Sequence, residues 1–330
     1  MPQTVLLSGP AGSGKRRFAL ETAKLINCGE GGCDACIACR KIDNLTHPDL
    51  FTLLPLGGGA KDAAAVREAQ REAALSYLEA DESLAHSGAN IARDHIRFLQ
   101  REMLYGPSEA PWKTALVFEA ECMHPAGANS LLKILEDPPP HAVFVLVSSH
   151  PERLLPTVVS RCQRLALRPL TLDEMRRRLG AEGASGERLE WAARLGEGSL
   201  ARGRRVAAGD YEERCRQVED FIAAGAEGRD EGYWRVLEEL GGRDNRAALE
   251  DFLRLCAQYA RDLFVMGCGR EGGVVQVERL DFLRRLQPVW SAARLERLAE
   301  EIDRAYGHLA HNVGVQLLLA DIWRVMRHGR

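Results

Sequence analysis

The first half of the chain alternates between short apolar runs and amphipathic stretches. A strand that is buried on both faces of a parallel sheet has a nearly continuous apolar sequence bounded by turn residues. Runs of this kind occur at Thr4–Gly9, Asp49–Pro55, Thr114–Ala120, Ala142–Ser149 and Cys162–Leu167. We expect each of these runs to form a strand of one sheet.

The stretches between these runs have helical spacing or helix boundary signals. Amphipathic helices are predicted over Lys15–Ile26 and Asp94–Met103, and a further helix begins at Pro125 and ends before Pro138. A short helical segment in "PERLLPTVVSR" precedes the last strand. Because strands that alternate with helices form a parallel sheet with helices on both faces, the predicted fold class is α/β.

The segment between the second and third predicted strands breaks this pattern. It begins with three glycines, Gly57–Gly59, and continues with many Ala and Glu residues and few large apolar side chains as far as Asn90. We interpret the segment from about residue 57 to residue 91 as an insertion into the α/β domain. It is expected to be either an exposed helix or a partly mobile loop.

The pattern changes after Pro169, which ends the sheet region. Thr171 and Glu174 have the spacing of a capping box at the start of a helix. No stretch after Leu170 has a strand pattern. We therefore predict an α/β domain over 1–168, a small helical lid over 169–208 and an all-helical domain over 209–330.

The composition of the 330-residue chain fits a soluble cytoplasmic protein. Hydrophobic residues make up 45% of the sequence and charged residues 28%, so the chain can bury large cores and still be soluble. No apolar run approaches the length needed to span a membrane, and the N-terminus lacks the layout of a secretion signal. A net charge of −3 excludes a uniformly basic nucleic-acid-binding surface, although a local basic face remains compatible with it.

The stretch "GPAGSGKRR" after the first strand resembles a phosphate-binding loop. In such a loop two glycines are separated by four residues and followed by Lys and then Ser or Thr, so that backbone N–H groups and the lysine surround a phosphate. Gly9, Gly12, Gly14 and Lys15 are candidate nucleotide-binding residues, but Arg16 stands where the magnesium-binding hydroxyl belongs.

A second metal position is also changed. In ATP-hydrolysing P-loop proteins an acidic residue at the end of a later strand helps to hold magnesium. Phe118 stands at this position here, and Glu119 stands where the water-polarising glutamate belongs. Because both magnesium-binding positions are changed, the loop is predicted not to hydrolyse ATP. Arg16 could supply charge in place of the metal, so static binding of ATP or ADP remains open.

Four of the nine cysteines lie close together. Cys28, Cys33, Cys36 and Cys39 have the spacing C-x4-C-x2-C-x2-C, which allows four thiolates to surround one Zn²⁺ ion. Four thiolates leave no open coordination position, so the predicted role is structural. An iron–sulfur cluster and a set of unliganded thiols are the alternatives. His47 in "THPD" is interpreted as a turn residue rather than a further ligand.

Several stretches together resemble the AAA+ subunits of the bacterial DNA polymerase III clamp loader. The incomplete phosphate loop, the cysteine cluster, "THPDLFTLLP", "DHIRFLQREM", "PERLLPTVVSRCQRL" and the C-terminal "NVGVQLLLADIW" all contribute to the resemblance. The most specific stretches are "LLKILEDPP" and "SRC". Within this family, the loss of both metal positions resembles the delta prime type more than the ATP-hydrolysing gamma/tau motor type.

This resemblance implies a three-part architecture. The α/β domain would be an AAA+ P-loop-type domain with an inserted zinc module, and the C-terminal helices would form a collar in a ring of five subunits. The implied partners are gamma/tau-like and delta-like subunits, the sliding clamp and, through the complex, primer–template DNA, with no membrane. The resemblance also implies that the chain itself does not hydrolyse ATP.

The resemblance further implies a role in trans for Arg161 in "SRC". A guanidinium that reaches a γ-phosphate across a subunit interface stabilises the charge that develops during phosphoryl transfer. From its position alone, Arg161 could equally be a surface ion-pair residue or a cap of the preceding helix. In the lid, Ala201 of "GSLARG" stands where motor subunits carry a nucleotide-sensing arginine, and Arg202 follows it.

Three other functions stay open at this point. A gamma/tau-like motor would need substitutes for both metal-binding positions. A P-loop kinase of a small molecule would share the strand, loop and helix, but it would not need the "SRC" stretch or the collar. A separate zinc-bearing DNA-binding protein is disfavoured by the net negative charge.

Overall fold

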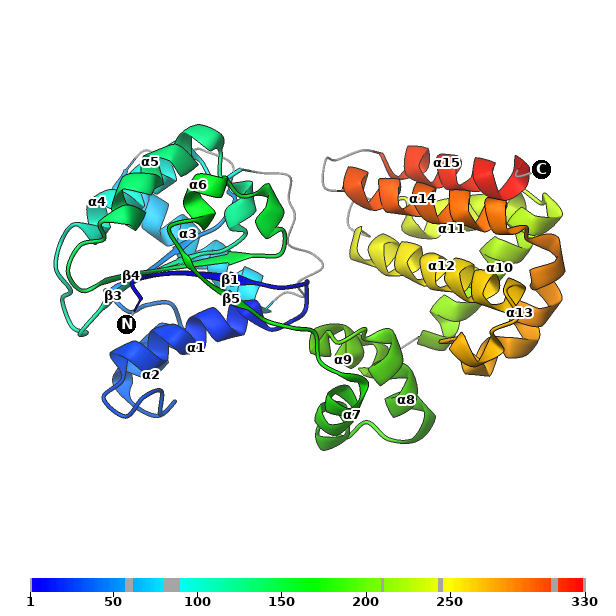
Figure 1. Ribbon diagram of the computed structural model, residues 1–330, viewed down its shortest axis with the longest axis horizontal. Coiled ribbons are helices and arrows are strands. Elements are labelled where there is room, and N and C mark those ends of the chain that lie inside the picture. The colour runs from blue at the N-terminus through cyan, green and yellow to red at the C-terminus, as the bar shows by residue number, and fades with distance from the viewer. Residues whose placement is uncertain are drawn as a thin grey trace. The chain divides into compact units, whose positions relative to one another are not determined.

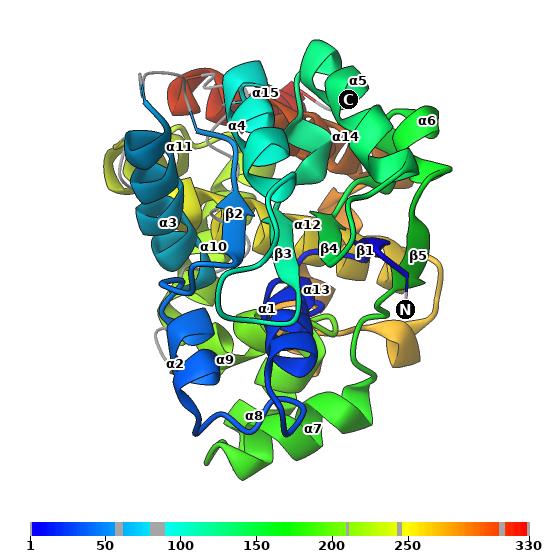
Figure 2. The same cartoon turned by 90° about the vertical axis from the view of Figure 1, so that its left-hand side faces the viewer.

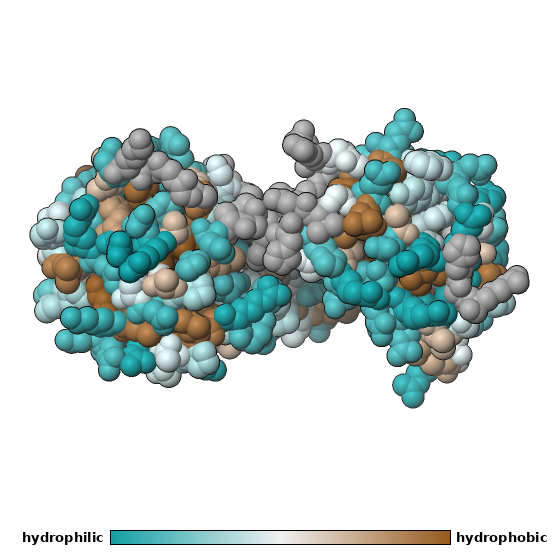
Figure 3. Space-filling view, turned by 90° about the horizontal axis from the view of Figure 1, so that it is seen from above, coloured by the Kyte–Doolittle hydropathy of each residue, from teal (hydrophilic) through white to brown (hydrophobic). Residues whose placement is uncertain are grey.

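The computed structural model describes residues 2–56, 62–79, 90–208, 211–242, 246–309 and 314–328. The chain forms two compact units, drawn in Figure 1. The first consists of Met1–Glu174 with Gly198–Ala201, and the second of Met175–Glu197 with Arg202–Arg330. On the face seen in Figure 3, each unit is largely hydrophilic with separate hydrophobic patches.

The first unit contains a five-stranded parallel sheet. Its strands are β1 (Thr4–Ser8), β2 (Leu50–Leu53), β3 (Lys113–Val117), β4 (Ala142–Ser148) and β5 (Gln163–Ala166). Their spatial order is β2-β3-β4-β1-β5, as Figure 2 shows. The five predicted strands and the parallel arrangement are confirmed.

Helices cover both faces of this sheet (Figure 1). Successive residues of a strand point to opposite faces, so Leu6 packs in the core beneath one helical layer and Leu7 in the core beneath the other. One layer contains α4 (Arg93–Met103), α5 (Pro125–Glu136) and α6 (Pro156–Val159). The other contains α1 (Lys15–Asn27) and α2 (Ile37–Asp43).

The expected insertion contains a helix, α3 (Ala63–Glu79), but this helix is not simply exposed. Val66, Gln70, Ala74 and Tyr77 are all buried, and they follow one another at the spacing of a single helical face. This face packs beside β2 and contributes to the same core as α1. The expectation of an exposed helix is therefore wrong for this side of α3. The predicted mobile loop falls partly on residues 57–61 and 80–89, which lie outside the described residues.

Short helices follow the sheet, beginning with α7 (Leu172–Ala181), α8 (Gly186–Leu195) and α9 (Leu200–Ala208). The predicted capping box at the start of α7 is confirmed. The Thr171 N–H donates to Glu174 Oε2 at 2.8 Å, and the Glu174 N–H donates to Thr171 Oγ1 at 3.3 Å.

The regular secondary structure in the remaining described part of the second unit is helical. An aromatic cluster of Phe221, Phe252 and Trp323 lies in the core of these helices, with ring centroids 5.2 and 5.0 Å apart around Phe221. No strand follows β5 in the described part of the chain, as expected. None of the described helices has the length and apolar character needed to cross a bilayer. The main helices here are α10 (Tyr211–Glu227), α11 (Glu231–Leu240), α12 (Arg246–Gly267), α13 (Leu280–Leu286), α14 (Ala292–Leu309) and α15 (Val315–His328).

Candidate functional site

The predicted phosphate loop connects β1 to α1 in the first unit. Gly9 lies so close to the backbone after β5 that a Cβ atom on it would be 2.3 Å from the carbonyl oxygen of Leu167. Gly12 has φ +80°, and a Cβ atom there would be 1.7 Å from Oγ of Ser199. Gly14, with φ +83°, directly precedes the first turn of α1. The glycines thus allow a tight loop that no larger residue could form at these contacts.

Lys15 folds back over this loop. Its side chain is buried, and Nζ donates to the carbonyl oxygen of Pro10 at 2.7 Å and to Oγ of Ser13 at 3.4 Å. The ammonium group therefore lies within the loop, where a bound phosphate group would meet it. The geometry of Gly9, Gly12, Gly14 and Lys15 fits an anion.

Arg16 does not belong to this cradle. Its side chain is buried; Nη1 donates to the carbonyl oxygen of Tyr77 at 2.9 Å, and Cζ lies 3.5 Å from the centroid of the Tyr77 ring. Nη2 lies 3.7 Å from Oε1 of Glu119. The guanidinium thus compensates a buried carboxylate. These contacts give Arg16 partners within the fold, and a role for its charge at a bound nucleotide stays a prediction.

Tyr77 also contacts Glu119. Its hydroxyl donates to Glu119 Oε1 at 2.5 Å. Burial, together with the nearby negative charge of Glu119, raises the pKa of Tyr77, so the hydroxyl stays protonated as a donor. Phe118 is completely buried and offers no oxygen. The residues at positions 16 and 118 therefore do not fit a nucleotide-bound magnesium ion.

The start of α9 lies at the phosphate loop. Residues Gly198–Ala201 belong to the first unit, and the contact between Ser199 and Gly12 joins them to the loop. Ala201 has no charged side chain to offer at the phosphate loop. Arg202 belongs to the second unit instead, where its guanidinium pairs with Glu197.

The four predicted metal ligands come together between the end of α1 and the start of α2. All four Sγ atoms of Cys28, Cys33, Cys36 and Cys39 lie within 4.8 Å of one another. The Sγ atom of Cys28 is 3.6 Å from that of Cys33 and 3.8 Å from that of Cys36. A tetrahedral ion with bonds of about 2.3 Å to sulfur separates its ligand atoms by about 3.8 Å, so the cluster fits Zn²⁺ in size.

The backbone around the cluster favours a thiolate at Cys28. N–H groups, foremost that of Cys33, lower the pKa of Cys28 to about 6, whereas burial raises the pKa of Cys39 to about 12. A divalent cation would bring all four thiols to the charged form, because a coordinating thiol is deprotonated. The four cysteines can hold a metal ion such as zinc.

A buried lysine forms ion pairs beside this cluster, and it was not predicted from the sequence. Lys24 is completely buried, and its Nζ lies 2.6 Å from Asp34, 2.9 Å from Asp43 and 3.1 Å from Glu21. Burial lowers the pKa of Lys24, but the three carboxylates outweigh it and raise the pKa overall. Only the spacing of Glu21 and Lys24 on one helix was a usable signal.

His47 is a turn residue, as predicted. Its Nδ1 accepts the N–H of Asp49 at 3.1 Å. The buried carboxylate of Asp49 accepts the N–H groups of Ser108, Glu109 and Ala110 at 2.6, 2.7 and 2.9 Å. "THPD" therefore anchors the loop before β3, and the only metal-binding group found among the described residues is the set of four cysteines.

Arg161 lies just after α6, at the surface of the first unit. Its side chain is 30% exposed; Nη2 donates to Oε2 of Glu136 at 2.9 Å, and Nη1 donates to the carbonyl oxygen of Thr157 at 3.0 Å. In the isolated chain Arg161 is thus both an ion-pair residue and a cap of α6. Its action on a neighbouring subunit stays a prediction.

Comparison with known proteins gives consistent matches. A family model described as "DNA polymerase III, delta subunit" matches residues 1–171. The chain is 33% identical over 168 residues to DNA polymerase III subunit delta' of Bacillus subtilis, a match that covers 50% of this chain and 42% of that protein. It is 34% identical over 224 residues to DNA polymerase III subunit delta' of Pseudomonas aeruginosa, covering 65% and 58%.

Two further comparisons bear on the motor type and on the fold. The chain is 29% identical over 170 residues to DNA polymerase III subunit tau of Bacillus subtilis, covering 50% of this chain and 24% of that protein. The matches therefore span from about a quarter to somewhat over half of these relatives. A DNA polymerase III gamma subunit-related protein from Thermotoga maritima has a similar fold, with a TM-score of 0.50 and 15% identity over 98% of this chain and 93% of that one.

Proposed function

Because the chain belongs to the DNA polymerase III delta/delta' clamp-loader family, we propose that it is a delta prime-type subunit of a bacterial clamp loader. In this role it helps to load the sliding clamp onto primed DNA in the cytoplasm and does not hydrolyse ATP itself. The observation that carries the proposal is the pairing of Arg16 with Glu119. It places a fixed cation beside the carboxylate where a hydrolysing subunit needs a metal-bound nucleotide.

Arg161 is the residue proposed to act on a neighbour. Its planar guanidinium can bind two oxygens of a γ-phosphate and stabilise the charge that spreads over them during transfer. Such a residue supplied in trans contributes a factor of about 10³–10⁵ to the rate. In this proposal Arg161 keeps its contacts with Glu136 and Thr157 until the loader assembles.

The remaining parts have supporting roles in this proposal. Cys28, Cys33, Cys36 and Cys39 would hold one structural Zn²⁺ ion, which ties the loop between α1 and α2 together. We retain the three-part division at residues 168 and 208, with the last part as a collar that joins gamma/tau-like and delta-like subunits. Contacts with the sliding clamp and with primer–template DNA are proposed to arise in the assembled complex.

A gamma/tau-like motor is the second candidate. The shape of the cradle around Gly12, Gly14 and Lys15 favours it, as does the similarity to tau. The two positions without a metal-binding oxygen, Arg16 and Phe118, argue against it. The family membership argues against a small-molecule kinase.

The test is the DNA- and clamp-stimulated ATPase of a reconstituted loader that contains this chain. We expect Arg161→Ala to reduce the rate by a factor of about 10³, and Lys15→Ala to leave it nearly unchanged. Assembly of each variant is checked by size-exclusion chromatography. A large loss with Lys15→Ala and little loss with Arg161→Ala would instead support the motor.

A further inference from the structure

A cavity in the second unit is lined by four arginines. It lies among α9, α10 and α12 and has a volume of about 250 Å³. The arginines are Arg202, Arg205, Arg214 and Arg254, and Asp251 is the one carboxylate among the lining residues. Guanidinium groups repel one another at close range, so this concentration of charge needs an explanation.

Internal partners account for part of that charge. Arg202 and Arg254 share Glu197, and Arg205 pairs with Asp251 at 3.2 Å. Arg214 differs from the others, because its one recorded contact is a donation from Nη1 to the carbonyl oxygen of Ala248 at 3.4 Å, which carries no full charge. Its guanidinium therefore forms no ion pair with a carboxylate in the described part of the chain.

The electrostatic surroundings agree with an excess of positive charge. Burial, followed by the charges of Arg254 and Arg205, lowers the pKa of Arg202. Burial raises the pKa of Glu250, the carboxyl group beside Arg254. A multivalent anion in the cavity would oppose the lowering of the Arg202 pKa.

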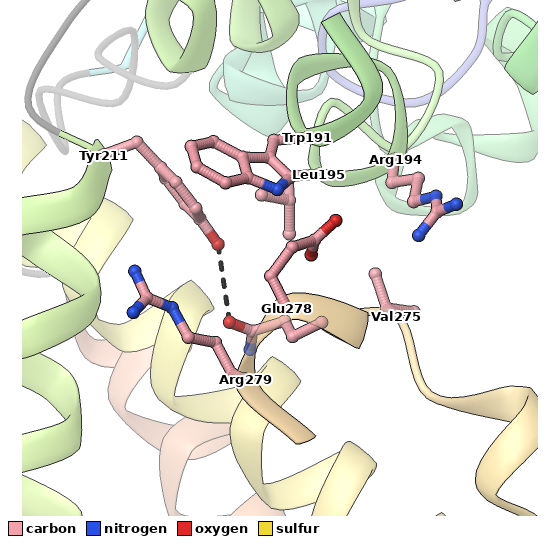
Figure 4. Close-up of a pocket in the computed structure, with 8 residues that line it drawn as sticks. Trp191, Arg194, Leu195, Tyr211, Val275, Glu278 and Arg279 are labelled. Atoms are coloured by element: carbon pink, nitrogen blue, oxygen red, sulfur yellow. Dashed lines mark hydrogen bonds between the residues drawn. The ribbon is translucent and has the colours of Figure 1, made fainter. Parts of the chain in front are cut away.

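The other side of the cavity is apolar and fixed in place. Leu195, Val206 and Leu255 line it together with the ring of Tyr211. Figure 4 shows Tyr211 from the adjoining pocket, where its ring packs against Trp191 with centroids 6.0 Å apart. Its hydroxyl contacts Oε1 of Gln276 at 3.5 Å. An apolar wall lowers the local dielectric constant and strengthens the attraction between the arginines and an anion.

We propose that this cavity is a binding site for a phosphate-bearing anion. Arg205 and Arg214 are assigned as the principal donors, with Arg202 and Arg254 behind them. The volume lies just below the usual range for whole cofactors, so it suits one or two phosphate groups rather than a dinucleotide. The site is separate from the loop at Lys15 and does not depend on the proposed function.

The experiment titrates pyrophosphate into the full-length protein by isothermal titration calorimetry. The wild type is expected to bind about one equivalent at the arginine cavity, and binding should weaken at least about tenfold in Arg205→Gln and in Arg214→Gln. Arg297→Gln removes an exposed arginine outside the cavity, and Lys15→Ala disables the loop. Both control variants should keep the cavity-dependent binding.

A second measurement uses only the wild-type protein, so its result does not depend on whether the variants fold. Phenylglyoxal labelling with mass spectrometry should show that pyrophosphate protects the four cavity arginines in the wild type, while Arg297 stays reactive. Equal affinity in the wild type and in both cavity variants, or no protection at millimolar pyrophosphate, would overturn the proposal.

A parallel titration identifies the source of the phosphate. A short 5′-phosphorylated single-stranded oligonucleotide replaces pyrophosphate in the same set of proteins. If it binds with the same dependence on Arg205 and Arg214 and competes with pyrophosphate, the ligand class is nucleic acid. If only pyrophosphate binds in this way, the ligand is a free phosphate compound. Either result supports a phosphate site.

Discussion

Two nitrogens of the Arg161 guanidinium, Nε and Nη2, donate to a single carboxylate oxygen of Glu136, at 3.1 and 2.9 Å. The side chain of Glu136 is 64% exposed, and the pair lies at the surface of the first unit. An exposed ion pair of this kind contributes at most about 1 kcal/mol, because water solvates both partners well. The pair can therefore open at little cost when a stronger anion is presented.

This low cost leads to a prediction that separates the two partners. In a reconstituted loader, Glu136→Ala should change the ATPase rate by less than about fivefold, because only a weak resting contact is lost. Arg161→Lys should lose most of the activity, since a lysine keeps the charge but not the two-pronged geometry. Steady-state ATPase assays measure both. Equal losses in Glu136→Ala and Arg161→Lys would mean that the ion pair itself is what matters.

The cysteine cluster makes a prediction about metal content. The purified wild type should contain about one zinc ion per chain, and Cys33→Ser should lose it readily to a chelator, since a site with three thiolates binds zinc more weakly. Thermal unfolding of Cys33→Ser should also begin at a lower temperature than that of the wild type. Elemental analysis and a chelator-release assay measure the metal.

Cys268 provides the matched control for this experiment. It is exposed and lies outside the cluster, so Cys268→Ser should retain the metal and the wild-type unfolding temperature. Stoichiometric zinc in Cys33→Ser would exclude that cysteine as a ligand. If the site instead holds an iron–sulfur cluster, the alternative that the sequence leaves open, the purified protein should contain iron in place of zinc and should absorb visible light.

Two buried histidines give a prediction about pH. Burial lowers the pKa of His47 and of His95 below the ordinary value of about 6.5. Gln70 Nε2 contacts His95 Nδ1 at 3.1 Å, and Nδ1 can accept this hydrogen bond only while it is unprotonated. The folded chain thus binds fewer protons than the unfolded chain just below pH 6.5. The free energy of unfolding is therefore full above this pH and falls as the pH is lowered toward the folded pKa values.

The variant His95→Gln isolates one of these contributions. It keeps a polar partner for Gln70 but cannot take up a proton, so its loss of stability between pH 7 and pH 5 should be smaller than that of the wild type. His308→Gln is the control, because His308 is exposed, and it should follow the wild type. The unfolding temperatures of the wild type and both variants, measured between pH 7 and pH 5, test this prediction. An identical pH dependence in His95→Gln and the wild type would show that His95 is not a stabilising neutral group.

The sequence predicted most of the sheet because each strand is a short apolar run with clear boundaries. It predicted the cysteine cluster because all the ligands lie within Cys28–Cys39, so the spacing alone restricts them to one loop. The capping box at Thr171 is equally local. These features depend on neighbours in sequence, which a single sequence displays directly.

The buried face of α3 was missed for a physical reason. Val66, Gln70, Ala74 and Tyr77 have the spacing of a helical face, but Gln is polar and Ala is small, so the face lacks a row of large apolar side chains. Gln70 is buried because its side chain exchanges hydrogen bonds with the backbone of Leu54 at 2.7 and 3.3 Å. The contacts of Arg16 could not be predicted for a similar reason, since its partners Tyr77 and Glu119 are far away along the chain.

The Arg16–Glu119 pair supplies the last prediction. Both side chains are more than nine-tenths buried, so removing one partner leaves an uncompensated charge away from water. Arg16→Met should therefore lower the free energy of unfolding by about 3 kcal/mol. Arg17→Met, which changes the exposed neighbour of Arg16, should change it by less than about 1 kcal/mol.

The double variant Arg16→Met/Glu119→Gln distinguishes charge compensation from packing. If Arg16 acts mainly by neutralising Glu119, the neutral glutamine should recover most of the stability lost in Arg16→Met, because the buried charge is gone. Chemical denaturation of the four proteins in this cycle measures the coupling. If the double variant is as unstable as the sum of the two single ones, the stacking of Arg16 on Tyr77 must account for the stabilisation instead. Recovery would mean that the guanidinium serves in the fold as the counter-ion of Glu119.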